Sequence, residues 1–174
     1  MFSKKRLFVP AVFIFTSFLG VSAANAQDAA CPYTLASLQG SYAVLVNYGA
    51  SVALGIQAQT LDGKGNLTRT GVLNQPTVGS ATGDRTVGTV TSTGTYTVNC
   101  NGAGTITRIV TRPDGTTAPA MDDFIITQAI KTPAGQLIAT TIVDAQRDPS
   151  VILPGGVFVT RVHTLLPDIN PSGN

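Results

Sequence analysis

The single histidine and a neighbouring arginine are the first candidates for chemistry. His163 and Arg161 lie in the segment 157–166, where they alternate with valine and leucine. This alternation predicts a strand that carries both side chains on one face. If that face points inward, the two groups can hydrogen-bond a ligand or each other; if it points outward, they are solvated. One histidine forms neither a triad nor a metal cage without partners, so no catalytic residue is assigned.

Two adjacent aspartates, Asp122 and Asp123, begin another predicted strand. Neighbouring residues of a strand point to opposite faces, so these two carboxylates cannot act together. Paired-carboxylate chemistry would need Asp123 to meet a carboxylate of a different strand, such as Asp144. The alternative is that both aspartates are solvated residues at the start of the strand and take part in no reaction. Asp123 is included among the candidate ligand-binding residues, for the case in which its side chain points into the barrel.

Two arginines, Arg108 and Arg112, alternate with Ile106 and Val110 on one face of a further segment. On an inward face they would line a channel for an anionic ligand. The alternative is that their aliphatic stems cover apolar surface while their charged ends stay in water. Arg108 is included among the candidate ligand-binding residues.

Two glycine-rich segments have the composition of ion-binding loops but not the spacing. Residues 62–66 (Asp-Gly-Lys-Gly-Asn) place lysine where a calcium loop needs an oxygen ligand, and no glutamate follows. Residues 101–104 (Asn-Gly-Ala-Gly) join strand to strand without the helix that a phosphate cradle uses. Both are therefore predicted to be hairpin turns, and we expect no metal site and no cofactor.

These candidates are positioned by long strands rich in threonine and valine. The stretch 94–112 shows the pattern, with two alternating segments on either side of an Asn/Gly turn, and a kink or bulge is expected at Gly94. The expected strands are 40–48, 51–61, 67–75, 86–98, 105–112, 121–131, 136–146 and 157–166. Short connections make consecutive strands antiparallel neighbours. Closure into an up-and-down barrel of about eight strands removes the two exposed edges, whereas a sandwich is the alternative.

Four aromatic residues are expected to face a cavity, if the barrel encloses one. They are Tyr42, Tyr48, Phe124 and Phe158. The alternative is that they are ordinary hydrophobic core residues with no contact to a ligand.

The chain begins with the pattern of a cleaved signal peptide over residues 1–26. Lys4, Lys5 and Arg6 precede an apolar run that ends in Ala-Asn-Ala at 24–26. An uncleaved membrane anchor is the alternative, and Pro10 within the run argues against it. We expect export to the periplasm or beyond, with no transmembrane segment in the processed chain. Its parts are then a segment 27–39 with a helical turn, a barrel 40–166 and a flexible tail 167–174.

Charge and cysteine content restrict the possible partners. Removal of residues 1–26 leaves 148 residues with eight basic and nine acidic side chains, so net charge provides no attraction for nucleic acid. All nine acidic residues are aspartate, and the absence of glutamate, a good helix former, fits a chain with little helix. Cys31 and Cys100 are predicted to form a disulfide that tethers the N-terminal segment. A metal or redox pair is the alternative, but the Cys-x-x-Cys spacing is missing.

Several motifs together resemble a group of small exported bacterial proteins with calycin-like barrels, related in shape to the lipocalin and allene oxide cyclase barrels. They are 38–42 (Leu-Gln-Gly-Ser-Tyr), 61–65 (Leu-Asp-Gly-Lys-Gly), 94–98 (Gly-Thr-Tyr-Thr-Val) and 101–104. Tyr42 stands where lipocalins have the tryptophan of their Gly-x-Trp signature. The resemblance implies a barrel and no particular chemistry.

Three functional hypotheses follow from these observations. The leading one is a non-catalytic binding module whose barrel holds a small, mostly apolar molecule, because eight strands enclose space for one such ligand. The second is a structural or surface protein with a filled barrel and a threonine-rich outer face. The third is an enzyme of the cyclase or isomerase kind that shapes its substrate within the cavity.

Overall fold

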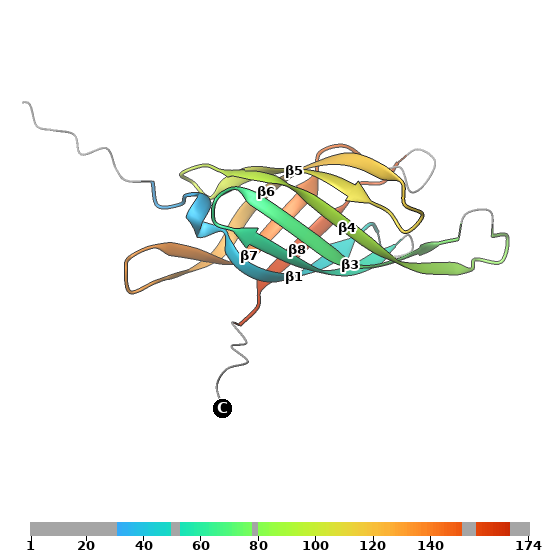
Figure 1. Cartoon of the computed structure of the whole chain (residues 1–174), viewed down its shortest axis with the longest axis horizontal. Helices are drawn as coiled ribbons and strands as arrows, with labels where there is room; N and C mark the ends of the chain where they lie inside the picture. The colour runs from blue at the N-terminus through green and yellow to red at the C-terminus, as the bar shows by residue number, and fades with distance from the viewer. Residues whose placement is uncertain (1–30, 50–52, 78–79, 151–155, 168–174) are drawn as a thin grey trace, which may run out of the picture. The chain divides into compact units, whose positions relative to one another are not determined.

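Eight antiparallel strands close into a single barrel in the described part of the chain (Figure 1). The computed structural model describes residues 31–49, 53–77, 80–150 and 156–167. The predicted signal peptide and all of the predicted tail except residue 167 lie outside the described residues. The strands are β1 (Gln39–Asn47), β2 (Leu54–Asp62), β3 (Asn66–Pro76), β4 (Arg85–Val98), β5 (Ala103–Thr111), β6 (Thr117–Lys131), β7 (Leu137–Gln146) and β8 (Thr160–Leu165).

Each strand pairs with its sequence neighbour, and β8 pairs with β1 to complete the cylinder. The predicted all-β, up-and-down barrel is therefore confirmed. The predicted irregularity at Gly94 was wrong, because β4 keeps continuous register with both neighbours there, and the register shifts instead lie between β6 and β7. Gly94 has a different role: a Cβ at this position would overlap the carbonyl oxygen of Thr107 on β5. Glycine thus allows the two backbones to approach closely where β4 faces inward.

Along most of the strands, side chains alternate between the barrel interior and its surface. In β1, Tyr42, Val44 and Val46 are fully buried while the residues between them face outward. In β4 the outward positions from 89 to 97 are all threonine, and Thr97 hydrogen-bonds the facing Thr105 at 2.9 Å between hydroxyl oxygens. The abundance of threonine thus belongs to the outer surface, where β-branched side chains suit an exposed strand.

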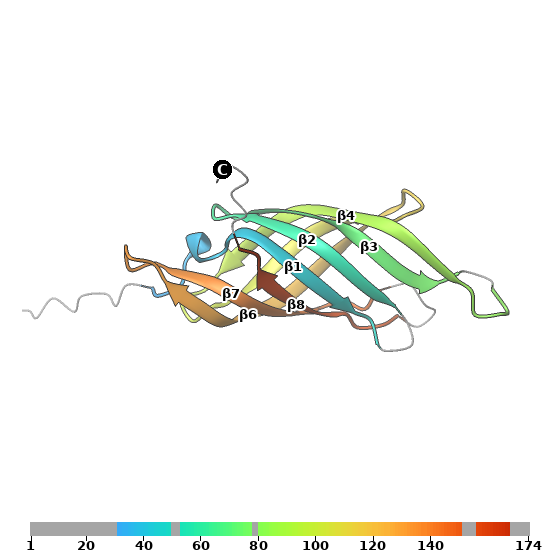
Figure 2. The ribbon, with the colours of Figure 1, turned by 90° about the horizontal axis from the view of Figure 1, so that it is seen from below.

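One end of the barrel is covered by the segment that precedes β1. It forms a single 3-10 turn, η1 (Leu35–Ser37), which lies at the end opposite the projecting β3–β4 hairpin (Figures 1 and 2). The hydroxyl of Tyr96 donates to the carbonyl oxygen of Leu38 at 2.7 Å, and Gln136 Nε2 donates to that of Ala36 at 2.8 Å. Apolar side chains fill the barrel beneath this cover, including Leu38, Tyr42, Leu61, Leu67, Tyr96, Phe124 and Ile126.

A disulfide between Cys31 and Cys100 joins the start of the cover to the β4–β5 turn. The two cysteines are 69 residues apart in sequence, and their Cα atoms are 4.6 Å apart. The predicted pairing is therefore confirmed. The bond holds the covering segment against the end of the barrel beneath η1, which we call the sealed end.

We expect the disulfide to add substantially to stability. Reduction should lower the free energy of unfolding by up to about 4 kcal/mol, because a cross-link over a loop of this length removes much of the unfolded chain's entropy. Urea denaturation with and without reductant measures this difference. The Cys31→Ser/Cys100→Ser variant should match the reduced protein and ignore reductant, and an unchanged midpoint on reduction would contradict the expectation.

Candidate functional site

A continuous chain of hydrogen-bonded polar side chains crosses the interior of the barrel. Its members come from six of the eight strands and are all at least nine-tenths buried. In order along the chain of contacts they are Arg69, Gln59, His163, Asp144, Arg161, Asp122 and Arg108. Buried polar groups are tolerated when they are hydrogen-bonded, so this layer can form only as a connected network.

One half of the network centres on Asp122, whose side chain is fully buried. Arg108 donates to its two carboxylate oxygens from Nε (2.7 Å) and Nη2 (3.1 Å). Arg161 Nη1 donates to the same carboxylate at 2.9 Å and to Asp144 at 2.8 Å. Two arginines from β5 and β8 are therefore held in place by one carboxylate from β6. The fork geometry of the Arg108 pair fixes the orientation of its guanidinium.

The other half of the network fixes the protonation of His163. Gln59 Oε1 accepts hydrogen bonds from Arg69, so the Gln59 amide must direct its Nε2 donor to His163 Nδ1 at 3.2 Å. The imidazole accepts at Nδ1 and therefore carries its proton on Nε2, which donates to Asp144 at 2.7 Å. A second proton on Nδ1 would face a donor. Burial, the largest influence, also lowers the pKa of His163, so the neutral form is favoured.

The network contains three arginines and two aspartates, which leaves one excess positive charge. Burial, together with Arg108 and Arg161, lowers the pKa of Arg69 to about 9, so Arg69 still carries its charge at neutral pH. Burial would raise the pKa of Asp144, but the hydrogen bond from His163 and the charge of Arg161 hold it well below its usual value. Among the buried side-chain atoms of the described residues, Arg69 Nη1 alone has no hydrogen-bond partner. The layer thus has a surplus of both cationic charge and donors.

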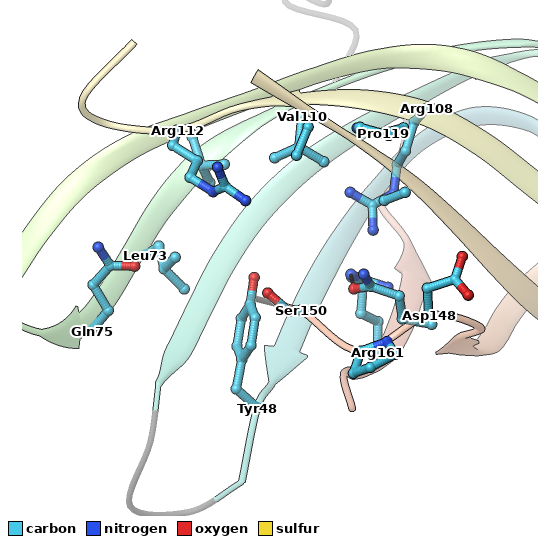
Figure 3. A pocket seen from close by; sticks show the side chains of 15 residues that line it. Tyr48, Leu73, Gln75, Arg108, Val110, Arg112, Pro119, Asp148, Ser150 and Arg161 are labelled. Atoms are coloured by element: carbon cyan, nitrogen blue, oxygen red, sulfur yellow. Dashed lines mark hydrogen bonds between the residues drawn. The ribbon is translucent and has the colours of Figure 1, made fainter. Parts of the chain in front are cut away.

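A cavity of about 250 Å³ lies on the other side of this polar layer from the sealed end. Figure 3 shows the side chains that line it. Arg108 and Arg161 contribute to its wall, and each is at most 5% exposed. Apolar side chains provide much of the remaining lining: Leu73, Val90, Val110, Ala118, Pro119 and Ala120. Tyr48, Gln75, Arg112, Gln146, Asp148, Pro149 and Ser150 complete it. The site combines an apolar surface with a few convergent polar groups, as small-molecule sites do.

Three of the predicted ligand-binding residues line this cavity: Tyr48, Arg108 and Arg161. His163 also faces inward, as one interpretation of its strand required, but it is enclosed in the network and does not line the cavity. The inward face of β5 is the one that carries Arg108, with Ile106 buried beside it.

The other predicted residues lie elsewhere. Tyr42 and Phe124 are buried core at the sealed end, where the Tyr42 hydroxyl donates to the carbonyl oxygen of Ala139 at 2.8 Å and burial raises its pKa. Phe158 is 68% exposed, because it alternates with the buried Val159 and faces outward. None of the three lines the cavity.

The prediction for Asp123 requires a correction. Asp123 is exposed and accepts a hydrogen bond from Arg147 at 3.0 Å on the outer surface, while its neighbour Asp122 faces inward. The β5–β6 turn determines this outcome, because it sets Ile106 opposite Asp122 in the ladder. Residues directly opposite one another share a face, so an inward Ile106 requires an inward Asp122.

Sequence reasoning also missed Gln59 and Arg69. A signal for both was present in the β2–β3 hairpin, where Leu61 pairs with Leu67 across the turn and both are buried. Two residues further from the turn, Gln59 pairs with Arg69, and the strand period places this pair on the same inward face.

The His163–Asp144 pair has the geometry of a histidine oriented by a carboxylate, which many enzymes use as a general base. Both side chains are almost fully buried, and neither lines the cavity. A general base must reach the proton that it removes. In this arrangement both ring nitrogens of His163 are hydrogen-bonded within the network, to Gln59 and Asp144. In the described residues, histidine, cysteine and aspartate side chains form no group of three or more that could hold a metal ion.

Comparison with protein-family models, curated proteins and solved structures finds no match for this chain. The resemblance to calycin-like exported proteins therefore stays a prediction. A search of the described part of the chain finds no helix with the length and apolar character needed to cross a membrane.

Asp122 should be essential for stability, whereas Asp123 should not. Asp122→Asn removes the carboxylate that Arg108 and Arg161 share and leaves buried cations without their partner, which costs about 3–5 kcal/mol in comparable cases. Asp123→Asn changes the adjacent residue in the same way on the exposed surface, where ion pairs contribute little. Urea denaturation of the two variants tests this contrast. Similar unfolding midpoints for both variants would show that the buried pairs do not stabilise the fold.

His163 should make stability depend on pH below about 6.5. Its pKa is lowered in the folded protein, so the unfolded chain binds the extra proton first as the pH falls below its ordinary value of 6.5. Stability is complete above that pH and should decrease below it by at most about 1.4 kcal/mol per pH unit. The difference in unfolding free energy between wild type and His163→Gln from pH 7 to 5 isolates this effect. The part of the pH dependence of the unfolding free energy that comes from His163 should be absent in the variant. An equal pH dependence in both proteins would contradict a neutral, buried His163.

Proposed function

We propose that this barrel is a non-catalytic binding module that holds one small, mostly apolar molecule in the cavity at the end away from η1. The observation that carries the proposal is the cavity of about 250 Å³, which has an apolar wall and two buried arginines. An eight-stranded barrel has room for side chains or for one small ligand. In this barrel side chains fill the end beneath η1, and space is left beyond the polar layer.

The two other hypotheses have less support. A purely structural role with a completely filled barrel does not require buried charged groups beside an internal cavity. A cyclase or isomerase could use a shaped pocket with few charged groups, but the histidine best placed to move a proton does not line the cavity. Binding accounts for the cavity without a reacting group inside it.

We also propose that binding takes place outside the cytoplasm, after removal of residues 1–26. The signal-peptide pattern and the Cys31–Cys100 disulfide support this location, because disulfides persist in oxidising compartments.

Native mass spectrometry of the protein purified from its own exported fraction tests the binding proposal. We expect a noncovalent adduct on the wild-type protein. Val110→Trp, which fills the cavity from β5, should lose the adduct, because the added ring occupies the same space. Ile109→Trp is the matched control, because it adds the same ring at the preceding residue, which is exposed on the outer face of β5. This variant should keep the adduct. Absence of any adduct from wild type, or its retention in folded Val110→Trp, would contradict binding in this cavity.

A further inference from the structure

The hydrogen-bonding groups beside the cavity indicate what kind of molecule fits it. The polar network has three arginines and two aspartates, and its excess charge lies on Arg69, which hydrogen-bonds the neutral Gln59 and does not line the cavity. The two network arginines that line the cavity, Arg108 and Arg161, are paired with Asp122 and Asp144. Two further charged residues line the cavity, Arg112 and Asp148, and they cancel each other. The arginines of the lining are therefore balanced by carboxylates of the protein, and what they offer an occupant is hydrogen-bond donors that the protein does not use.

The unused donor groups point into the cavity. Arg108 uses Nε and Nη2 for Asp122, and its Nη1 makes no hydrogen bond within the described residues. The same is true of the Tyr48 hydroxyl, which points into the cavity, as do the guanidinium groups of Arg108 and Arg112 (Figure 3). A guanidinium and a hydroxyl that converge on one space match the planar, multi-acceptor shape of a carboxylate.

The remaining lining limits the rest of the molecule. Leu73, Val90 and Val110 provide an apolar wall, and the cavity volume is below the roughly 300–1,000 Å³ typical of drug-sized sites. A short aliphatic chain or a single ring fits this space.

We infer that the cavity binds a small organic monocarboxylate, with the carboxylate near Arg108, Arg112 and Tyr48 and the hydrocarbon part against Leu73, Val90 and Val110. This inference rests on the proposed function, because it requires that the cavity is a binding site. It adds the chemical class of the ligand and the end of the molecule that each wall contacts.

Titration of the disulfide-bonded protein with hexanoate and, separately, with hexanamide tests the inference. The two probes have nearly the same shape and differ in charge, so the protein should bind hexanoate at least about tenfold more tightly, because hydrogen bonds between charged partners are stronger than neutral ones. Calorimetry or ligand-detected NMR gives both affinities. Arg112→Gln should weaken the binding of hexanoate several-fold and that of hexanamide by a smaller factor, because only hexanoate loses a charge-assisted hydrogen bond. It avoids the buried network, since the Arg112 guanidinium hydrogen-bonds only the exposed Thr116 among the described residues.

Lys131→Gln is the matched control, because Lys131 ends β6 at the far end of the barrel and its loss changes the net charge equally. It should leave both affinities unchanged. Equal binding of the two probes, or an equal loss of hexanoate in Arg112→Gln and Lys131→Gln, would overturn the carboxylate inference and leave the binding function intact. Failure of both probes to bind at millimolar concentrations would count against the proposed function as well.

Discussion

The architecture of this barrel depends on one buried carboxylate that two arginines share. Asp122 receives three hydrogen bonds from Arg108 and Arg161, and none of these groups has contact with bulk water beyond a few per cent of its surface. Each charge is tolerated inside the barrel only because the others are present. The interaction joins β5, β6 and β8, and it also orients the two guanidinium groups that reach the cavity.

The polar layer divides the barrel into two unlike halves. On one side η1 and the disulfide hold a cover over packed apolar side chains, so this half provides the hydrophobic burial that stabilises the fold. On the other side the strands enclose a cavity, and two arginines of its wall, Arg108 and Arg161, are held in place by the network behind them. Such preorganisation lowers the cost of binding, since little side-chain freedom remains to be lost.

Strand parity explains which site residues could be predicted. Arg161 and His163 share one face of β8 with apolar residues, and Arg108 shares one face of β5 with Ile106 and Val110, so the sequence identifies a common face for each strand. Both faces point inward. In β6 both faces carry apolar residues, Phe124 and Ile126 on one and Ile125 on the other, and the pattern does not select between Asp122 and Asp123. The choice is made by the β5–β6 turn, whose register pairs Asp122 with the inward Ile106.

The amino-acid sequence by itself determined that the chain is nearly all strand, that the strands are consecutive antiparallel neighbours and that Cys31 joins Cys100, because these features follow from residue period, turn chemistry and cysteine number. The tertiary structure decided which groups meet. Gln59 meets Arg69 across the β2–β3 hairpin, and Asp144 meets His163 between the consecutive strands β7 and β8. The contact that joins these two pairs, between Gln59 and His163, exists only because barrel closure brings β2 near β8. The position of the cavity is also a property of the tertiary structure, since it depends on where packed side chains fill the barrel and where they leave space.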